Sequence, residues 1–461
     1  MPFLLPSFFL AQVPPVAVSK EVVQRQEVRA LPGELDTFPV FNSNSPEAIQ
    51  ADGILLSTFP PRGKRVSAAH LNFPFQGRFD LFAQHVAKPQ SSQDARPLYL
   101  GIILHNPERH SVKVLVLQAT SYLSQSQAPF IQLPSQMENP FGKFYAGPGS
   151  RVTSDVLRRQ VQSGWPVSLV IPPGKSQMLL NLPIPTFPSN GRTTWMRLWS
   201  NGKVYIASLA MFAQPGSQGK LRAPVLEEWQ TLLDTGDLAK PRDRTPTPPG
   251  KVTGEFTYGR VAGVSQGSQW QAEVTDNPQA SQLSIPQRGQ AFSYGINTLD
   301  HGTLGTGQVQ SAPLLVRYPD TAYRAHGNYG VKYSLTLPLY NNTKQPQTVS
   351  LAIQTPIKEN QLSKGGLRFL NPPARQVFFR GTVQLRYTDD KGAPQIRYLH
   401  LVQQRGEQGK PLIMLEIPPG KRRSVEVGFL YPPDSTPPQV LTVQTLNDAN
   451  FKQASQIDPP H

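Results

Sequence analysis

The chain has 461 residues, more than one ordinary hydrophobic core can accommodate, so its length suggests two or three domains. Hydrophobic residues make up 38% of it and charged residues only 16%, a balance that excludes a wholly disordered chain. The 48 prolines disfavour long helices, and the absence of cysteine excludes disulfides and thiol chemistry. A net charge of +15 favours acidic partners such as acidic polysaccharide, anionic lipid or nucleic acid, or it only gives the protein a soluble basic surface. No motif of a specific nucleic-acid-binding module accompanies that charge.

The first eleven residues form an apolar stretch that is too short to span a bilayer. Such a stretch is typical of the apolar region of a secretory signal, and cleavage is expected after Ala11, although no basic residue precedes the stretch. No later segment has 18 consecutive apolar residues, so no transmembrane span is predicted. We therefore expect an exported protein, located in the periplasm, on the cell surface or in the medium.

Two segments in opposite halves of the chain carry the same ordered pattern. Residues 100–120 and 335–355 align without a gap, and each predicts a strand, a turn led by asparagine and a second strand. The turn sequence Ile-Pro-Pro-Gly-Lys follows both segments, at residues 171–175 and 417–421. Because the shared parts come in the same order and a long way apart, we interpret them as duplicated domains rather than a short-period repeat.

Short strands separated by turn signals predict an all-β protein of two tandem β-sandwich domains, immunoglobulin-like or jelly-roll-like, with long Pro-rich loops. One or two short helices are expected, at residues 153–161 and 224–233. Asn201-Gly202 predicts a hairpin turn between residues 196–199 and 204–212. The predicted divisions are a signal-peptide remnant (1–11), a linker (12–30), the first sandwich (31–224), a helix and Pro-rich linker (225–250), the second sandwich (251–434) and a polar tail (435–461).

Few residues suggest a catalytic or ligand-binding role. Asp80 with His85, and Asp300 with His301, both precede the duplicated hairpin, so each could form a carboxylate–imidazole pair at equivalent positions, or simply fix a loop. Ser150 and Arg151 follow a glycine-rich segment that could hold an anion at a helix start, or only begin the helix. The histidines show no metal-ligand spacing, so neither a metal nor another cofactor is predicted.

Catalysis is not indicated by the carboxylates. A glycosidase needs two of them flanking the scissile bond, and no spacing singles out a pair. The carboxylates considered are Glu108, Asp155, Glu227 and Glu228. No nucleophile elbow, phosphate-binding loop or dinucleotide fingerprint is present, so we expect no enzymatic activity.

Several segments together resemble an uncharacterised family of secreted cyanobacterial proteins, classed as domain of unknown function 3370. The resemblance spans most of the chain from about residue 27. It implies an exported protein of a photosynthetic bacterium and implies no catalytic residue. The segments are LPGELD (31–36), PVFNSNSP (39–46), GILLSTFPP (53–61), HLNFPFQGRFD (70–80), YAGPGSR (145–151), ASLAMF (207–212) and LEEW (226–229).

Three functional hypotheses follow. The favoured one is a non-enzymatic envelope or extracellular protein that binds an acidic polysaccharide, the cell wall or another envelope protein. The second is a hydrolase of envelope polysaccharide or peptide. The third is a self-assembling structural or adhesion module that pairs through exposed strand edges.

Overall fold

The computed structural model of this chain describes residues 19–89, 91, 93–251 and 254–449. The expected signal-peptide remnant, residues 1–11, lies outside the described residues. Most of the described chain is β-strand, and its α-helices are α1 (Pro148–Leu157) and α2 (Leu226–Thr235), so the all-β sandwich-like prediction is confirmed. Helix α1 begins five residues before the expected start because Pro148 takes a first-turn position, where a missing N–H costs nothing. Single 3-10 turns occur at Ser67–Ala69 and Ser217–Gly219.

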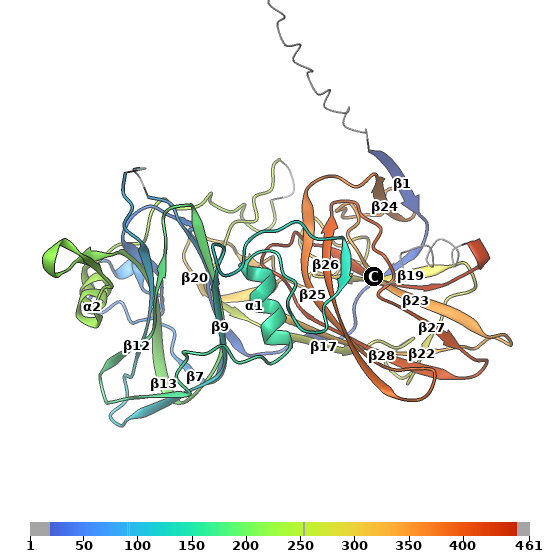
Figure 1. Ribbon diagram of the computed structural model, residues 1–461, viewed down its shortest axis with the longest axis horizontal. Coiled ribbons are helices and arrows are strands. Elements are labelled where there is room, and N and C mark those ends of the chain that lie inside the picture. The colour runs from blue at the N-terminus through green and yellow to red at the C-terminus, as the bar shows by residue number, and fades with distance from the viewer. Residues whose placement is uncertain (1–18, 90, 92, 252–253, 450–461) are drawn as a thin grey trace, which may run out of the picture.

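The first sandwich, at the left of Figure 1, is built on one twelve-stranded sheet folded into two layers. Most of its strands come from the first half of the chain, and three come from the second half. Its strands are β4 (Pro39–Ser43), β5 (Ala48–Ile49), β6 (Gly53–Ser57), β7 (Phe75–Ala87), β8 (Leu98–His105), β9 (Val112–Leu123), β11 (Ser168–Ile171), β12 (Ser176–Ile184), β13 (Asn190–Phe212), β16 (Ala262–Gln266), β20 (Ala312–Arg317) and β21 (Arg324–Ala325).

The long strand β13 belongs to both layers of the first sandwich. Its first part pairs with β7 and β9, and after a register shift between Ser200 and Val204 its second part pairs with β6 and β8. The hairpin predicted at Asn201-Gly202 is therefore wrong. The Oδ1 of Asn201 accepts a hydrogen bond from the N–H of Lys113 at 2.8 Å, so this dipeptide lies at a bend between layers and not at a reversal of the chain.

The second sandwich, at the right of Figure 1, packs an eight-stranded sheet against a five-stranded one. The larger sheet contains β10 (Gln136–Glu138), β26 (Pro394–Gln404), β25 (Val377–Thr388), β28 (Arg422–Leu430), β22 (Lys332–Tyr340), β17 (Gln269–Glu273), β3 (Glu34–Leu35) and β18 (Leu283–Ser284). The smaller contains β2 (Glu27–Arg29), β19 (Ala291–Ile296), β29 (Gln439–Thr445), β23 (Gln347–Gln354) and β27 (Ile413–Ile417).

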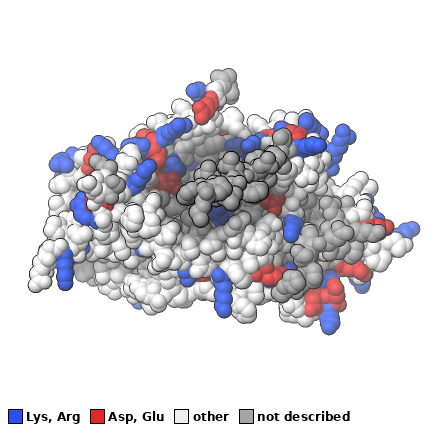
Figure 2. All heavy atoms as spheres, turned by 45° about the horizontal axis from the view of Figure 1, so that its top comes forward, with Lys and Arg blue, Asp and Glu red and all other residues white. Residues whose placement is uncertain are grey.

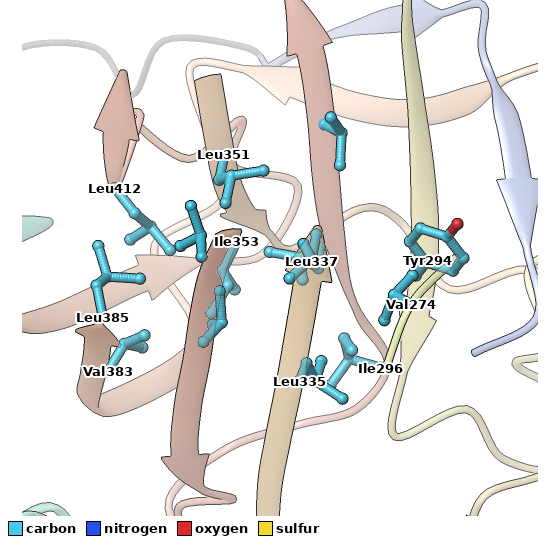
Figure 3. Packing of buried hydrophobic residues seen from close by; sticks show 14 of the residues in the cluster. Val274, Tyr294, Ile296, Leu335, Leu337, Leu351, Ile353, Val383, Leu385 and Leu412 are labelled. Carbon is cyan, nitrogen blue, oxygen red and sulfur yellow. The ribbon is translucent and has the colours of Figure 1, made fainter. Parts of the chain in front are cut away.

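The core of the second sandwich lies between these two sheets. Figure 3 shows Leu337 of β22 on the side of Ile353 of β23, and Leu335 of β22 beside Ile296 of β19, so alternate residues of β22 point inward as the pleat requires. All four side chains are buried. Two small pairs of strands stand outside the main sheets: β1 (Lys20–Gln24) with β24 (Leu367–Asn371), and β14 (Gln214–Pro215) with β15 (Leu221–Arg222).

The two sandwiches exchange strands, and this changes the expected divisions of the chain. Residues 12–30, expected as a linker, contain β1 and β2, which pair with β24 and β19 of the second half. Residues 435–461, expected as a polar tail, contain β29, a central strand of the five-stranded sheet whose residues are nearly all buried. A strand with sheet partners on both edges and apolar neighbours on its inner face cannot stay in solvent as a tail.

The expected linker at 225–250 also packs on the first sandwich. Helix α2 covers β6 and β13, and the backbone after it forms hydrogen bonds with β6, including Ala239 N–H to the Ile54 carbonyl at 2.9 Å. Strands from both sides of this segment lie in both sandwiches. Residues 225–250 are therefore not a boundary between two independently packed domains.

The duplicated unit predicted from sequence is present. Hairpin β8–β9 corresponds to β22–β23, and in each half the first strand pairs with the strand after the Ile-Pro-Pro-Gly-Lys turn: β8 with β12, and β22 with β28. In each half the second hairpin strand pairs with the strand before that turn, β9 with β11 and β23 with β27. Gly174 and Gly420 adopt φ values of 64° and 65° at the same turn position, a conformation that favours glycine.

Candidate functional site

A cavity of about 270 Å³ lies where the two sandwiches meet. Its walls come from the end of β4, from β7, and from loops of the second half of the chain. We call it the junction cavity. It is lined by Asn42, Asn44, Glu47, Gln84, Tyr258, Gly259, Arg260, Val261, Leu299, Ala325, His326, Gly327, Asn328, Tyr329, Lys358, Pro433, Ser435, Thr436 and Pro437.

Three buried polar atoms of the lining residues have no hydrogen-bond partner in the described chain. They are Oδ1 of Asn42, Oδ1 of Asn44 and Nδ1 of His326, on residues that are 6%, 6% and 8% exposed. Leaving a buried polar group unpaired costs about 1–3 kcal/mol, so such atoms are rare in folded proteins. All three atoms belong to residues that line this one cavity, so we take it as the candidate ligand site.

The cavity has one cation without a carboxylate partner in the described chain. Lys358 Nζ lies 3.2 Å from the hydroxyl of Tyr258 and 4.6 Å from the centre of its ring, and burial lowers the pKa of this lysine. Arg260, in contrast, forms ion pairs with Glu47 and with Asp243. Lys358 is therefore the group available to an anionic ligand, because the charge of Arg260 is already balanced.

His326 contributes a neutral imidazole to the cavity wall. Burial lowers its pKa to about 4, against the opposing effect of Asp300, so the ring carries no charge at neutral pH. Its Nδ1 is 3.9 Å from Asp300 Oδ2, beyond hydrogen-bond distance. A neutral imidazole has one donor and one acceptor nitrogen, which suits a hydroxyl group better than an anion.

Asp300 and His301, predicted as a carboxylate–imidazole pair, lie behind the cavity wall and do not line it. The backbone carbonyl of Asp300 accepts a hydrogen bond from the Tyr258 hydroxyl at 2.5 Å. The His301 ring packs on Phe256, with 4.5 Å between ring centres. Both residues therefore position the segment that carries Tyr258, which is the loop-fixing alternative considered for them.

Asp80 and His85 also do not pair, because their side chains lie on opposite faces of β7. Asp80 accepts two hydrogen bonds from Arg197, at 2.9 and 2.8 Å. His85 Nδ1 lies 2.8 Å from the Pro46 carbonyl and Nε2 lies 3.0 Å from Ser43 Oγ, so this ring holds the segment that carries Asn44. The proposed equivalence with Asp300 and His301 is wrong, since those residues lie beyond the end of β19.

Ser150 and Arg151 join structural contacts at the start of α1. Ser150 Oγ lies 2.8 Å from His400 Nε2, and both residues are fully buried. The guanidinium of Arg151 stacks on Tyr122, 4.0 Å from the ring centre, and donates to the carbonyl of Gln127. No side chain caps the helix, and its first turn is buried. This helix start therefore links the two sandwiches and gives an anion no access.

The carboxylates weighed for glycoside hydrolysis do not converge. Asp155 lies on α1 between the sandwiches and accepts a hydrogen bond from the Tyr122 hydroxyl at 2.7 Å. Glu227 and Glu228 lie on α2 at the far end of the first sandwich, where Glu228 pairs with Arg222 at 2.7 Å. Glu108 accepts from the N–H of Lys203 at 3.2 Å. This set supplies no pair flanking a common cleft.

The residues that line the cavity were not predicted from the sequence. A usable signal was present in Phe41-Asn-Ser-Asn44, where amides at alternate positions end an otherwise apolar buried strand. His326 and Lys358 had no such signal, because loops from distant parts of the chain bring them together. In the described parts of the chain, no cluster of His, Asp and Glu could hold a metal ion. No helix there is long and apolar enough to cross a bilayer.

Among solved structures the chain is similar to Lac15 from a marine microbial metagenome, with 13% identity, a TM-score of 0.10, and 81% of this chain and 54% of that chain covered. The chain thus spans about half the length of Lac15. It is also similar to procruciferin, the 11S globulin of Brassica napus, with 10% identity, a TM-score of 0.10, and 86% and 85% covered. TM-scores this low do not show a shared fold. No curated protein matches. Residues 26–445 match the family described as protein of unknown function (DUF3370), and the chain belongs to that family.

Proposed function

We propose that this protein is exported and that it binds an acidic glycan of the cell envelope in the junction cavity, without transforming it. The observation that carries the proposal is the set of buried unpaired atoms around the cavity, on Asn42, Asn44 and His326. Sugar hydroxyl groups can donate hydrogen bonds to amide oxygens. They can also donate to, or accept from, the two nitrogens of a neutral imidazole. A hydroxyl-rich ligand would satisfy all three atoms together.

Lys358 supports an acidic ligand over a neutral one. A carboxylate placed near its Nζ would form a charge-assisted hydrogen bond, which is about twice as strong as a neutral one. The Tyr258 and Tyr329 side chains add apolar wall beside these polar groups, as in many small-ligand sites. Export is supported by the apolar N-terminal stretch of the sequence and by the family resemblance.

The basic surface would add attraction at longer range. Figure 2 shows Lys and Arg spread over one face and interspersed with Asp and Glu, with no single dominant basic patch on the part that is visible. In this proposal the cavity provides the specificity for the ligand. The surface charge only raises the local concentration of an anionic ligand.

The test is calorimetric titration of the full chain with an oligogalacturonate and with a neutral oligosaccharide of the same length. We expect binding of the acidic oligosaccharide that weakens with added salt. Lys358→Gln should weaken it about 10- to 100-fold, the usual value of a hydrogen bond to a charged group. The matched control is Lys344→Gln, an exposed lysine in the β22–β23 turn. Equal binding of both oligosaccharides, or binding of neither, would contradict the proposal.

A further inference from the structure

Much of the positive charge of the chain is concentrated in residues 109–226. This segment contains twelve Lys and Arg residues and only two carboxylates, Glu138 and Asp155. Glu138 is already paired with Arg397, and Asp155 accepts the Tyr122 hydroxyl. The segment therefore supplies a formal excess of ten positive charges, out of a net charge of +15 for the whole chain.

The same part of the chain carries an unusual share of exposed apolar side chains. Sixteen large apolar side chains are exposed among the described residues, and eight of them lie between residues 117 and 170. Single exposed apolar residues are ordinary, but a concentration next to unpaired cations needs an explanation. The eight are Leu117, Phe130, Ile131, Phe141, Phe144, Val161, Val167 and Val170.

The most exposed of these residues lie on two loops that meet at the C-terminal end of α1. Arg158, at that end, donates a hydrogen bond to the Pro140 carbonyl at 2.9 Å, which joins the loop after β10 to the loop after α1. Phe141 is 76% exposed, and Val161 and Val167, on the second loop, are 92% and 83% exposed. Lys143 Nζ lies 5.9 Å from the ring centre of Phe141.

The cations of these loops have no carboxylate partner in the described chain. No ion pair is formed there by Lys143, Arg158 or Arg159, and Arg158 uses its guanidinium on backbone carbonyls. Residues 139–147 and 158–167 contain no Asp or Glu. We call this surface, made of Phe141, Lys143, Arg159, Val161 and Val167, the α1 loop surface.

We infer that the α1 loop surface binds the surface of a lipid bilayer that contains anionic phospholipid. Protruding phenylalanine and valine side chains gain free energy by entering the boundary between head groups and acyl chains, while Lys and Arg stay among the anionic head groups. The centre of a protein–protein interface is instead depleted of lysine, and a glycan offers no apolar phase for Val161. The inference does not depend on the glycan proposal, because the two surfaces share no residue.

The test is flotation of the full chain with vesicles of phosphatidylcholine, alone or mixed with phosphatidylglycerol. We expect the protein to float only with the mixed vesicles. Lys143→Gln should weaken that binding about fivefold, the value of one lysine near an anionic surface. The double variant Phe141→Ser, Val161→Ser should weaken it further. Leu315→Ser and Lys344→Gln, at exposed positions away from these loops, are the matched controls and should bind normally.

Three results would overturn the inference: absence of binding to mixed vesicles, equal binding to both kinds of vesicle, or normal binding by the Phe141 and Val161 double variant. The last result would place the membrane contact elsewhere on the chain. Because the substituted side chains are exposed, their urea unfolding midpoints should match that of the unchanged protein, which separates a loss of binding from a loss of folding.

Discussion

The indole ring of Trp229 lies directly over Gly101, so closely that a Cβ atom built on this glycine would come within 2.7 Å of Cε2 of the ring. This contact docks α2 on the first sandwich. Gly101→Ala should therefore lower the free energy of unfolding by about 1–3 kcal/mol, the usual cost of overpacking a core. Urea denaturation followed by tryptophan fluorescence would measure it. Gly428→Ala, where the nearest atom would be 3.7 Å away, is the control and should change stability much less.

Asn106 and Asn341 should contribute equally to stability, because each makes the same contacts in its own sandwich. The amide of Asn106 donates to the carbonyls of His110 and Ile171, and that of Asn341 donates to Gln345 and Ile417, all at 2.7–2.8 Å. Replacing either by alanine leaves one buried carbonyl group unpaired, that of Ile171 or of Ile417, whereas the other carbonyl belongs to an exposed residue. We expect a loss of about 1–3 kcal/mol for each substitution, from the one buried group.

Urea unfolding of Asn106→Ala and Asn341→Ala would test this prediction. Asn342→Ala, at the exposed neighbouring position in the same turn, is the control and should remain within about 0.5 kcal/mol of the unchanged protein. A loss confined to one of the two buried asparagines would show that the duplicated turns are energetically unlike.

Stability should fall as the solution is acidified below about pH 6.5, in part because of His85. Burial lowers the pKa of this histidine to about 4, so the folded chain keeps it neutral while the unfolded chain takes up a proton near pH 6.5. Between these values the unfolded state binds more protons, so stability increases with pH. At pH 5 the unfolded state should gain about 2 kcal/mol from this one group relative to pH 7.

His85→Gln removes that proton uptake. The variant should therefore lose about 2 kcal/mol less than the unchanged protein between pH 7 and pH 5, whatever its stability at pH 7. Unfolding midpoints in urea at the two pH values would measure the difference. An identical loss in both proteins would mean that His85 does not titrate on unfolding in this range.

The two sandwiches should unfold in a single transition. Strands β16 and β20 complete the first sandwich and β2 completes the second, so neither can lose its structure without exposing partners in the other. Calorimetry should give a van 't Hoff enthalpy close to the calorimetric enthalpy. A fragment of residues 31–224 should not fold alone, since it lacks β16 and β20. Two separate transitions, or a folded fragment, would contradict this prediction.

The sequence predicted those parts of the fold that depend on local signals. The aligned hairpins with Asn106 and Asn341 were recognisable because the turn residues and the strand periodicity lie within about twenty residues of each other. The exchange of strands between the sandwiches was not recognisable, because pairing between β4 and β16 leaves no local mark. A short apolar strand has the same sequence pattern whichever sheet it joins.

The cavity was predictable only in part. Asp300 and His301 were selected for their chemistry and lie just behind its wall, whereas His326 and Lys358 depend on how distant loops pack. A sequence shows which side chains can ionise, but their distances to one another come from tertiary structure. Asp80 is one example: the sequence shows that it can ionise, but its neutralising partner Arg197 lies 117 positions further along the chain.

The N-terminal strand β1 has a consequence for biosynthesis. Glu21, in β1, pairs with Arg368 of β24, 347 positions later, so the first described strand has no partner until most of the chain has been made. At about 5–20 residues per second, a ribosome needs roughly 20 to 70 s to supply that partner. During this time the unpaired edge of β1 is open to pairing with other chains, so we expect incomplete chains to aggregate more readily than finished ones.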